Sequence, residues 1–325
     1  MNPLVRIMMA TYNGEKFIQQ QIDSIISQTY KKWNLIIQDD GSKDGTWRII
    51  EEYANNDARI TIRKSPEEKH GAYYNFHSIA NQEKQNGSSF DYYMFCDQDD
   101  VWDDDKIERM LHAFINTDES IPKLIYGDMR VMNAEEQVVI GSVVREQGLF
   151  YKNAASLFFS HIIYGCNLMM NKAAFYSVPV IDTNADIVSI LSHDNLYAKF
   201  AGVRGRVQYL DVPLMTYRRH GGNVTAKHQY GFGIKRILKR MSKLDDLAKD
   251  HARTYKQSLY AIKLLQEIGG KGSVNLTEIY NCIRSSGLKA VKLYCNNKID
   301  CGNRVKNVSR CVVLFTGMQK KYLFD

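Results

Sequence analysis

The acidic run Asp97-Gln98-Asp99-Asp100 is the part of the sequence best suited to chemistry. It follows the apolar segment 92–96, which is typical of a buried strand. Three carboxylates within four residues repel one another, and burying them together is costly unless a cation neutralises them. Oxygen ligands of this kind suit Mg²⁺ or Mn²⁺ rather than zinc. The run therefore predicts a divalent metal that bridges the protein and a diphosphate, with a solvated acidic turn as the alternative.

Two further polar clusters follow apolar segments closer to the start of the chain. Thr11-Tyr12-Asn13-Gly14 comes after the segment 4–9, and Asp39-Asp40-Gly41-Ser42 comes after the segment 34–38. Ligands of open α/β sheets bind in the crevice at the carboxyl ends of the strands. The three clusters therefore predict one ligand-binding edge. Helix capping by Asn13 is the structural alternative.

The elements that must position these clusters alternate through the first hundred residues. Short apolar runs indicate strands, and apolar residues spaced along one face indicate helices. The expected strands are 4–9, 34–38, 59–63 and 92–96, and the expected helices are 14–28, 46–54 and 72–86. Such alternation predicts an α/β fold whose mixed, mostly parallel sheet lies between helices.

The pattern changes after residue 105, where shorter elements follow one another. We expect helices at 105–115 and 194–201, and strands at 123–126, 128–132, 137–140, 164–170 and 206–209. From residue 231 onward the chain has the periodicity of helices, interrupted by a glycine-rich linker at 269–273.

Charge is distributed unevenly along the 325 residues. The net charge is +7, but residues 231–325 carry +12 and the rest of the chain carries −5. Within 234–247 apolar and basic residues alternate on a helical pattern, which suits the surface of an anionic membrane. A solvated helix packed on the body is the alternative. Nucleic acid is the weakest option, because no nucleic-acid fold signature is present.

Several other function classes lack their motifs. The sequence has no G-x-G-x-x-G, no G-x-x-x-x-G-K-[ST] and no G-x-S-x-G, which argues against dinucleotide enzymes, P-loop NTPases and serine hydrolases. Its six cysteines form no C-x-x-C pair, so we expect reduced thiols and no zinc cluster. Neither an apolar run of membrane-spanning length nor a signal peptide is expected from the sequence.

Several ordered motifs resemble those of family 2 glycosyltransferases. These are ATYNGEKFIQQQIDSIISQTY at 10–30, NLIIQDDGSKDGT at 34–46 and the D-x-D region FCDQDDVW at 95–102. The sequence DQDDVW, followed by HDN at 193–195 and YRRHGGNVT at 217–225, is similar to the rhamnosyltransferase-like bacterial branch. The resemblance spans about residues 4–225. It implies a GT-A fold and inverting transfer of a sugar from a nucleotide diphosphate.

The resemblance assigns the first two clusters to the nucleotide of the donor. Thr11, Tyr12 and Asn13 match the segment that holds the nucleoside. Asp40 matches the carboxylate that contacts the base, and Asp39 supports it.

The metal and the diphosphate are assigned to later residues. Asp99 matches the aspartate in direct contact with the metal, and Asp97 contacts the ribose or a metal-bound water. His220 falls where related enzymes have a histidine near the metal and diphosphate, and Arg218 and Arg219 are candidates for stabilising the leaving group. A plain turn residue is the alternative for His220.

Asp194 falls where the family places its catalytic base. A carboxylate there would take the proton of the acceptor hydroxyl during attack. Helix capping is the alternative role for Asp194. Asn195 replaces an aromatic residue expected in many relatives, and Arg219 replaces a common glutamine. Both departures leave the reaction class intact and the identity of the sugar open.

Together these inferences predict a GT-A domain over 1–225, with a nucleotide-binding half at 1–105 and an acceptor half at 106–225, and a basic helical extension over 226–325. We expect a metal-dependent inverting glycosyltransferase that uses dTDP-rhamnose or, second, a UDP-hexose. Its expected acceptor is a lipid-linked surface polysaccharide or an oligosaccharide, and its expected place is the cytoplasm, at the inner face of the plasma membrane. An inactive sugar-nucleotide or glycan-binding protein and a nucleotidyltransferase are the alternatives. The sequence leaves the oligomeric state open.

Overall fold

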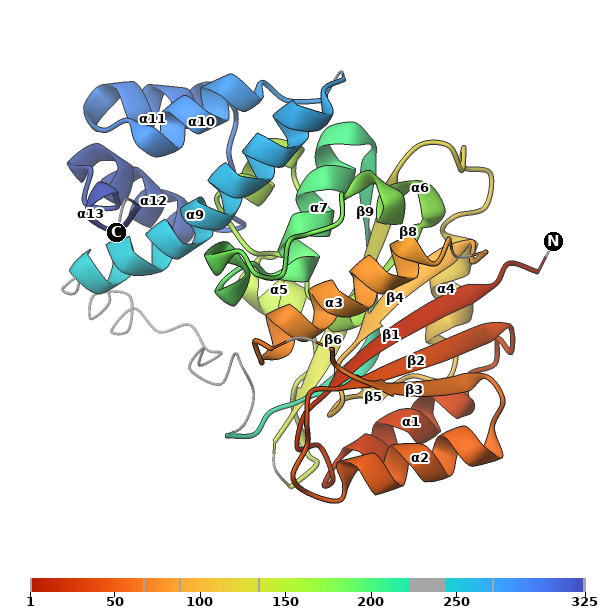
Figure 1. Cartoon of the computed structure of the whole chain (residues 1–325). Helices are drawn as coiled ribbons and strands as arrows, with labels where there is room; N and C mark the ends of the chain where they lie inside the picture. Colours follow the sequence, from red (N-terminus) through yellow and green to blue (C-terminus); the bar gives the residue numbers. More distant parts are fainter. Residues whose placement is uncertain are drawn as a thin grey trace.

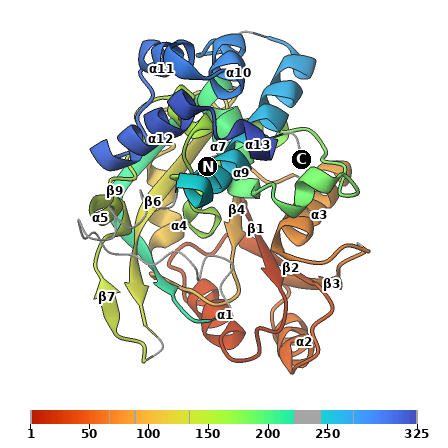
Figure 2. The ribbon, with the colours of Figure 1, turned by 90° about the vertical axis from the view of Figure 1, so that its left-hand side faces the viewer.

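The computed structural model describes residues 2–323 apart from 67, 88, 134, 222–243 and 271. One nine-stranded sheet runs through the body in the order β3-β2-β1-β4-β8-β6-β9-β5, with β7 paired to β6. Helices cover the sheet, and a group of helices from the end of the chain gathers at the end of the molecule remote from α1 and α2 (Figures 1 and 2).

The first half of the body has the alternating architecture that the sequence predicts. Strands β3, β2, β1 and β4 are parallel neighbours, with α1 and α2 on one face of this part of the sheet and α3 on the other (Figure 1). The elements are β1 (Val5–Thr11), α1 (Ile18–Ile26), β2 (Trp33–Asp39), α2 (Thr46–Asn56), β3 (Ile60–Lys64), α3 (Ala72–Gln85) and β4 (Tyr92–Cys96). Every residue of β4 is buried, which explains its uninterrupted apolar sequence.

The second half adds mixed pairing. Strand β8 is antiparallel to both β4 and β6, whereas β6 and β9 run parallel to each other. The elements are β5 (Val101–Trp102), α4 (Lys106–His112), β6 (Lys123–Met132), β7 (Val138–Ile140), α5 (Val143–Gln147), η1 (Ala154–Phe158), η2 (Gly165–Asn167), β8 (Leu168–Asn171), α6 (Lys172–Ser177), η3 (Asp186–Ser189), α7 (His193–Arg204) and β9 (Arg206–Arg218).

Three predictions for this half were wrong in detail. The two strands predicted at 123–126 and 128–132 form the single strand β6, whose pairing with β9 is irregular around Gly127 and Asp128. The strand predicted at 206–209 continues to Arg218, because β9 pairs with β6 along its whole length and with β5 on its other edge at Met215 and Thr216. The strand predicted at 164–170 begins as the 3-10 turn η2, and only 168–171 joins the sheet.

The end of the chain is helical, as predicted, and its first helix packs on the body. The elements are α9 (Leu244–Ile268), α10 (Leu276–Arg284), α11 (Gly287–Asn296), α12 (Arg304–Thr316) and α13 (Lys320–Leu323). Tyr255 and Ile262 of α9 are fully buried, and Ser258 Oγ donates a 2.7 Å hydrogen bond to the Phe158 carbonyl of η1. Most of the predicted membrane helix, including 234–241, lies outside the described residues.

The boundary that we predict at residue 225 also falls within 222–243, so the division into domains stays a prediction. The predicted linker at 269–273 is anchored where it is described, since Ser273 N and Oγ each donate a 2.8 Å hydrogen bond to carbonyls at the end of α7. In the described part of the chain, no helix combines the length and the apolar character needed to span a membrane. All six cysteines are free thiols, as expected.

Candidate active site

The loops that follow β1, β2 and β4 are joined at one edge of the sheet. Gln98 accepts hydrogen bonds from Thr11 Oγ1 (2.6 Å) and from Tyr12 N (2.9 Å), and its amide donates to the Tyr12 carbonyl (3.0 Å). Asn13 N donates to Ser42 Oγ (2.9 Å), and Lys43 N donates to Asn13 Oδ1 (2.8 Å). The three clusters singled out in the sequence therefore lie together, because parallel strands end at the same edge.

Asp39 is held within its own turn. One carboxylate oxygen accepts from Gly41 N (3.1 Å) and Ser42 N (2.9 Å), and the other accepts from Ser42 Oγ (2.5 Å). Gly41 has φ 81°, a conformation that favours glycine. These contacts give Asp39 the supporting position that the sequence suggests.

Asp40 links the same turn to the start of α3. Its Oδ1 lies 2.9 Å from His70 Nδ1, and its Oδ2 accepts a 2.7 Å hydrogen bond from Gly71 N. The side chain of Asp40 is buried, whereas that of His70 is 64% exposed. If the nucleobase of the donor contacted Asp40, it would share this carboxylate with His70 and Gly71.

The acidic loop after β4 is electrostatically strained. Burial, together with the charges of Asp99 and Asp194, raises the pKa of Asp97 to about 7. Burial and the charges of Asp99 and Asp97 raise the pKa of Asp100 well above its ordinary value. Carboxylates in this arrangement favour a bound proton or a cation.

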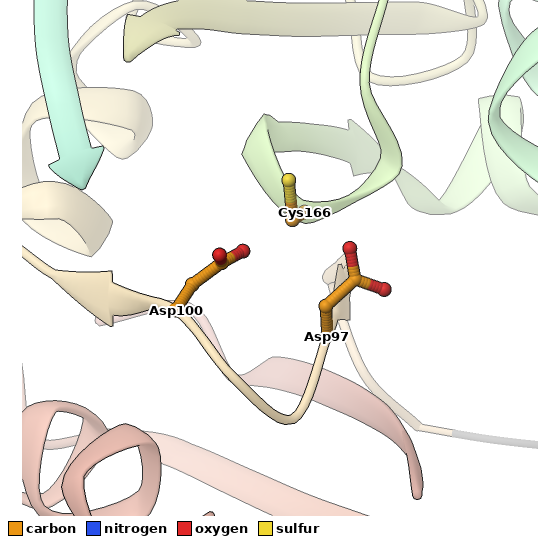
Figure 3. A group of neighbouring side chains, drawn as sticks. All are labelled: Asp97, Asp100 and Cys166. Atoms are coloured by element: carbon orange, nitrogen blue, oxygen red, sulfur yellow. The ribbon is translucent and has the colours of Figure 1, made fainter. Parts of the chain in front are cut away.

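Cys166 lies against this loop. Figure 3 shows the side chains of Asp97 and Asp100 pointing toward Cys166 from the two ends of the loop. One ligand atom from each of the three lies within 4.8 Å of the others, so they form a candidate metal cluster among the described residues. However, burial and the two aspartates raise the pKa of the Cys166 thiol well above its ordinary value, which keeps it protonated. A thiol is also a poor ligand for Mg²⁺ or Mn²⁺.

A buried lysine lies beside the same loop. Lys106 Nζ donates a 2.6 Å hydrogen bond to the Cys166 carbonyl and lies 3.9 Å from the centre of the Trp102 ring. Burial lowers the pKa of Lys106 to about 8, and its charge offsets part of the repulsion at Asp97 and Asp100. Trp102 is therefore a core residue that packs under this lysine.

His220 and Arg218 contact the acidic loop from the end of β9. His220 Nε2 lies 2.7 Å from Asp99 Oδ2, and its ring packs 4.8 Å from that of Phe17. Arg218 N donates to Asp100 Oδ1 (3.0 Å), and its Nε donates to the Asp99 carbonyl (3.1 Å). The structure thus brings the predicted pair of Asp99 and His220 together.

The guanidinium of Arg218 is buried, at 1% exposure. It also donates to Glu136 Oε1 (2.8 Å) and to Gln20 Oε1. These contacts hold the acidic loop. Arg219 N donates a 3.0 Å hydrogen bond to the Met132 carbonyl, which continues the pairing with β6.

Asp194 lies in the first turn of α7. The interpretation of Asp194 as a helix cap is wrong, because α7 begins at His193 and Ser192 occupies the capping position. Its Oδ1 accepts from Ser192 Oγ, from Asn195 N (2.6 Å) and from His161 Nε2 (3.1 Å). Its Oδ2 accepts from Gly165 N (2.9 Å).

Electrostatics keep Asp194 ionised. Burial alone would raise its pKa, but the charge and hydrogen bond of His161, helped by His193 and Ser192, bring the pKa well below its ordinary value. The charge of Asp194 helps to raise the pKa of Asp97, and the charges of both carboxylates help to raise the pKa of Tyr73, so the two lie close enough to interact electrostatically. This ionised carboxylate is available to accept a proton.

Comparisons with known proteins decide the family. The chain matches the family model described as Glycosyl transferase family 2 over residues 6–178, more than half of its length. The protein belongs to glycosyltransferase family 2.

Curated relatives of this family carry related sequences. The dTDP-rhamnosyl transferase RfbG of Shigella flexneri is 29% identical over 234 residues, which cover 68% of this chain and 76% of RfbG. The UDP-Glc:alpha-D-GlcNAc-diphosphoundecaprenol beta-1,3-glucosyltransferase WfgD of Escherichia coli is 29% identical over 46% of this chain and 53% of WfgD.

Solved structures share the fold. TarS 1-349 of S. aureus in complex with UDP-GlcNAc aligns with a TM-score of 0.55 at 13% identity, covering 98% of this chain and 91% of TarS 1-349. The mannosyltransferase PcManGT of Pyrobaculum calidifontis, in complex with GDP-Man and Mn²⁺, aligns with a TM-score of 0.51 at 14% identity, covering 100% and 88%. The predicted GT-A fold is confirmed, and with the family match the protein is a glycosyltransferase that uses a nucleotide-sugar donor.

A divalent cation of the kind expected in this family fits the donor set at the acidic loop. Asp97 and Asp99 offer oxygen ligands, and His220 offers a nitrogen within 2.7 Å of Asp99. Burial and the negative charge of Asp99 raise the pKa of Asp97. A cation bound between the two carboxylates would offset this excess of negative charge.

Three residues of the site carry no signal in the sequence. Cys166, Lys106 and His161 reach the acidic loop or Asp194 only through the tertiary fold. None belongs to a motif, and each is an ordinary residue type for a core or a surface loop. The spacing of the chain therefore gives no reason to select them.

Helix α9 also reaches the site. Gln257 Oε1 accepts a 3.2 Å hydrogen bond from Ser192 N, at the start of helix α7, which carries Asp194. The charge of Arg253 of α9 lowers the pKa of Tyr73, on which Asp194 and Asp97 also act. Helix α9 thus forms part of the surroundings of Asp194.

Proposed function

We propose that this protein is a metal-dependent, inverting glycosyltransferase that builds a bacterial surface polysaccharide. The observation that carries the proposal is the pairing of two unlike carboxylate environments in one site. Asp97 and Asp99 repel each other and favour a cation, while Asp194 is ionised and held by four hydrogen-bond donors.

Asp99, Asp97 and His220 would hold Mg²⁺ or Mn²⁺ in this proposal. A divalent cation there supplies a Lewis acid for the charge that develops on the leaving diphosphate. Thr11, Tyr12, Asn13 and Asp40 would bind the nucleoside, with Asp39 fixing the turn that carries Asp40. We assign Arg218 to positioning the acidic loop, since its guanidinium is buried among protein partners, and keep Arg219 as a diphosphate contact.

Asp194 would act as the general base. The acceptor hydroxyl loses its proton to the Asp194 carboxylate as its oxygen bonds to the anomeric carbon. The bond from the anomeric carbon to the phosphate oxygen breaks at the same time, and its electron pair leaves with the diphosphate. Attack on the face opposite the leaving group inverts the anomeric centre, so no covalent enzyme intermediate is needed.

The donor that we propose first is dTDP-rhamnose, and UDP-hexoses come second. RfbG, which is named a dTDP-rhamnosyl transferase, supports the first choice. WfgD, whose name includes UDP-Glc and a diphosphoundecaprenol-linked acceptor, supports the second choice and a lipid-linked saccharide as acceptor.

A lipid-linked acceptor would bring the protein to the inner face of the plasma membrane. The charge of +12 over residues 231–325 favours an anionic surface. On the helices described there, Leu288, Val308 and Phe315 are exposed apolar residues. Peripheral contact through this region is therefore part of the proposal, and recovery of the protein on anionic vesicles at low and high salt would test it.

The proposed function is tested by a donor screen with the purified full chain. Thermal shift with dTDP-rhamnose, UDP-glucose and UDP-GlcNAc, with Mn²⁺ or with EDTA, should identify a stabilising donor only when the cation is present. Release of the nucleoside diphosphate should follow the same pattern. Stabilisation without release would indicate a binding protein. Release of pyrophosphate from a nucleoside triphosphate and a sugar 1-phosphate, assayed in parallel, would indicate a nucleotidyltransferase; either result would overturn the proposal.

A further inference from the structure

Asp194 is held by a half-exposed histidine that no motif marks. His161 lies in the loop between η1 and η2, and its Nε2 is 3.1 Å from Asp194 Oδ1. The side chain of His161 is 39% exposed and that of Asp194 is 11% exposed. The neighbouring Ile162 and Ile163 are buried, so the loop is anchored beside the carboxylate. One partner of this pair reaches solvent while the other is enclosed.

The two oxygens of Asp194 are occupied unequally. Within the described part of the chain, Oδ1 accepts from three donors, namely Ser192 Oγ, Asn195 N and His161 Nε2. Oδ2 accepts one hydrogen bond, from Gly165 N. A carboxylate oxygen has room for about two strong hydrogen bonds. Oδ1 is therefore saturated, and Oδ2 retains the capacity to accept a proton from a hydroxyl group.

We propose that His161 is a positioning residue that fixes Asp194 through Oδ1, so that Oδ2 is the atom that receives the proton of the acceptor hydroxyl. This inference rests on the proposed function of Asp194 as the base. In the transfer step the acceptor O–H bond breaks, its proton goes to Oδ2, and the freed electron pair forms the new bond to the anomeric carbon. The bond from that carbon to the phosphate oxygen breaks at the same time, and its electron pair leaves with the nucleoside diphosphate. His161 keeps its hydrogen bond to Oδ1 throughout.

The charge of His161 also tunes Asp194. A protonated imidazole lowers the pKa of the carboxylate beside it and so weakens it as a base. Removing the imidazole should therefore raise the pKa of Asp194 as well as free its carboxylate to move.

Other titratable groups face Asp194 from the packed elements. Burial lowers the pKa of His193 to about 4 and that of His77 to about 3, so both rings are neutral near pH 7. Burial raises the pKa of Tyr73, which is also neutral there. The positive charge of Arg253 of α9 acts on Tyr73 in the opposite sense and lowers its pKa.

Two of the neighbours change charge near pH 7. Burial lowers the pKa of Lys199 to about 7, and burial with the charge of Asp99 raises that of Asp97 to about 7. The informative quantity is therefore the difference between the pH profiles of the wild type and a His161 variant. The profile of the wild type alone does not isolate His161.

The test compares His161→Ala and His161→Gln with the wild type as full chains. Release of the nucleoside diphosphate from dTDP-rhamnose, UDP-glucose and UDP-GlcNAc in Mn²⁺, with water as acceptor, is measured from pH 5 to 8.5. Donor affinity is measured by calorimetry. We expect H161A to lower kcat by roughly 10- to 100-fold at unchanged donor affinity, because a misplaced base loses alignment. H161Q retains a side-chain N–H donor, so it should recover most of kcat, and its pH profile should differ from that of the wild type because the charge that lowers the pKa of Asp194 is gone.

The matched control is His112→Ala, since His112 lies in the last turn of α4 and is exposed. It should leave both the rate and the pH profile unchanged. If H161A releases product as fast as the wild type with the same profile, or if it loses activity only through weaker donor binding, the role of His161 is overturned and the proposed function stands. If the wild type releases nothing from any of the three donors, the proposed function itself fails and the role of His161 falls with it.

Discussion

The turn after β2 and the loop after β4 are both acidic, but they treat their carboxylates in opposite ways. Asp39 and Asp40 are supplied with donors by their own surroundings, from the backbone at 41–42 and at 71 and from Ser42 and His70. Asp97 and Asp100 face one another and Asp99 in a buried setting that raises their pKa values. Acidic residues at a strand end can therefore be satisfied structural groups or groups that need a ligand, and only their partners distinguish the two cases.

The largest effect on activity should come from a substitution in the acidic loop after β4. Asp99→Asn should lower release of the nucleoside diphosphate by roughly 10³-fold. The substitution replaces a negatively charged ligand of the cation by a neutral amide, and the cation is what stabilises the charge on the leaving diphosphate. Steady-state kinetics in Mn²⁺ would measure this loss. Asp104→Asn is the control, since Asp104 is exposed and bonded to Ser27 Oγ (2.9 Å). A D99N protein with near wild-type activity would remove the acidic loop from the mechanism.

The second largest effect on activity should come from Asp194, the proposed base. Asp194→Asn should lower the rate by roughly 10²-fold or more, since an amide cannot take the acceptor proton. Donor affinity measured by calorimetry should remain close to that of the wild type. The D99N variant should instead lose metal-dependent donor binding. Undiminished transfer by D194N would exclude Asp194 as the base.

A third substitution tests the turn after β2, whose carboxylates already have hydrogen-bond donors in the protein. Asp39→Ala should lower the free energy of unfolding by about 3 kcal/mol, because two backbone N–H groups and a hydroxyl lose a charged acceptor. Urea unfolding with and without Mn²⁺ would measure it, and the loss should be the same in both conditions. A loss that appears only with Mn²⁺ would mean that Asp39 belongs with the acidic loop.

The smallest effect should have the opposite sign. With its pKa raised from 3.8 to about 7, Asp97 contributes stability that is complete below about pH 4 and is lost as the pH rises through 7. In the metal-free protein at pH 8, Asp97→Asn should therefore raise the melting temperature, by about 2–4 °C if roughly 1 kcal/mol is recovered.

Mn²⁺ sharpens this last prediction. It should stabilise the wild type at pH 8 and have a smaller effect on D97N, as differential scanning fluorimetry would report. A lower melting temperature for metal-free D97N would show that the ionised carboxylate is satisfied by the protein itself. The contrast between the two acidic segments would then disappear.

The first hundred residues were predictable because each element there is defined locally. Continuous apolar runs such as Tyr92–Cys96 occur in strands buried on both faces, and the polar clusters follow directly where those strands end. The second half was less predictable. A single strand, β6, carries Gly127 in its middle. The length of β9 depends on pairing with the distant residues of β6 and β5.

The candidate site divides in the same way. Asp97, Asp99, Asp194 and His220 lie in motifs and could be selected in advance, although their roles remain predictions. The structure changes the picture of Arg218, whose buried guanidinium contacts Gln20, Glu136 and the Asp99 carbonyl. A basic residue beside a motif histidine suggests phosphate binding, and burial among protein acceptors is a property that spacing does not encode.

The sequence alone determined the α/β architecture, the edge at which the polar clusters meet and the family to which the chain belongs. Periodicity and strand-end position are local properties, and parallel strands necessarily end together. The tertiary structure decided which carboxylates have donors and which repel, and it brought His161 to Asp194 and Cys166 to Asp97. Those are effects of burial and of contacts between distant segments, and both exist only once the chain has folded.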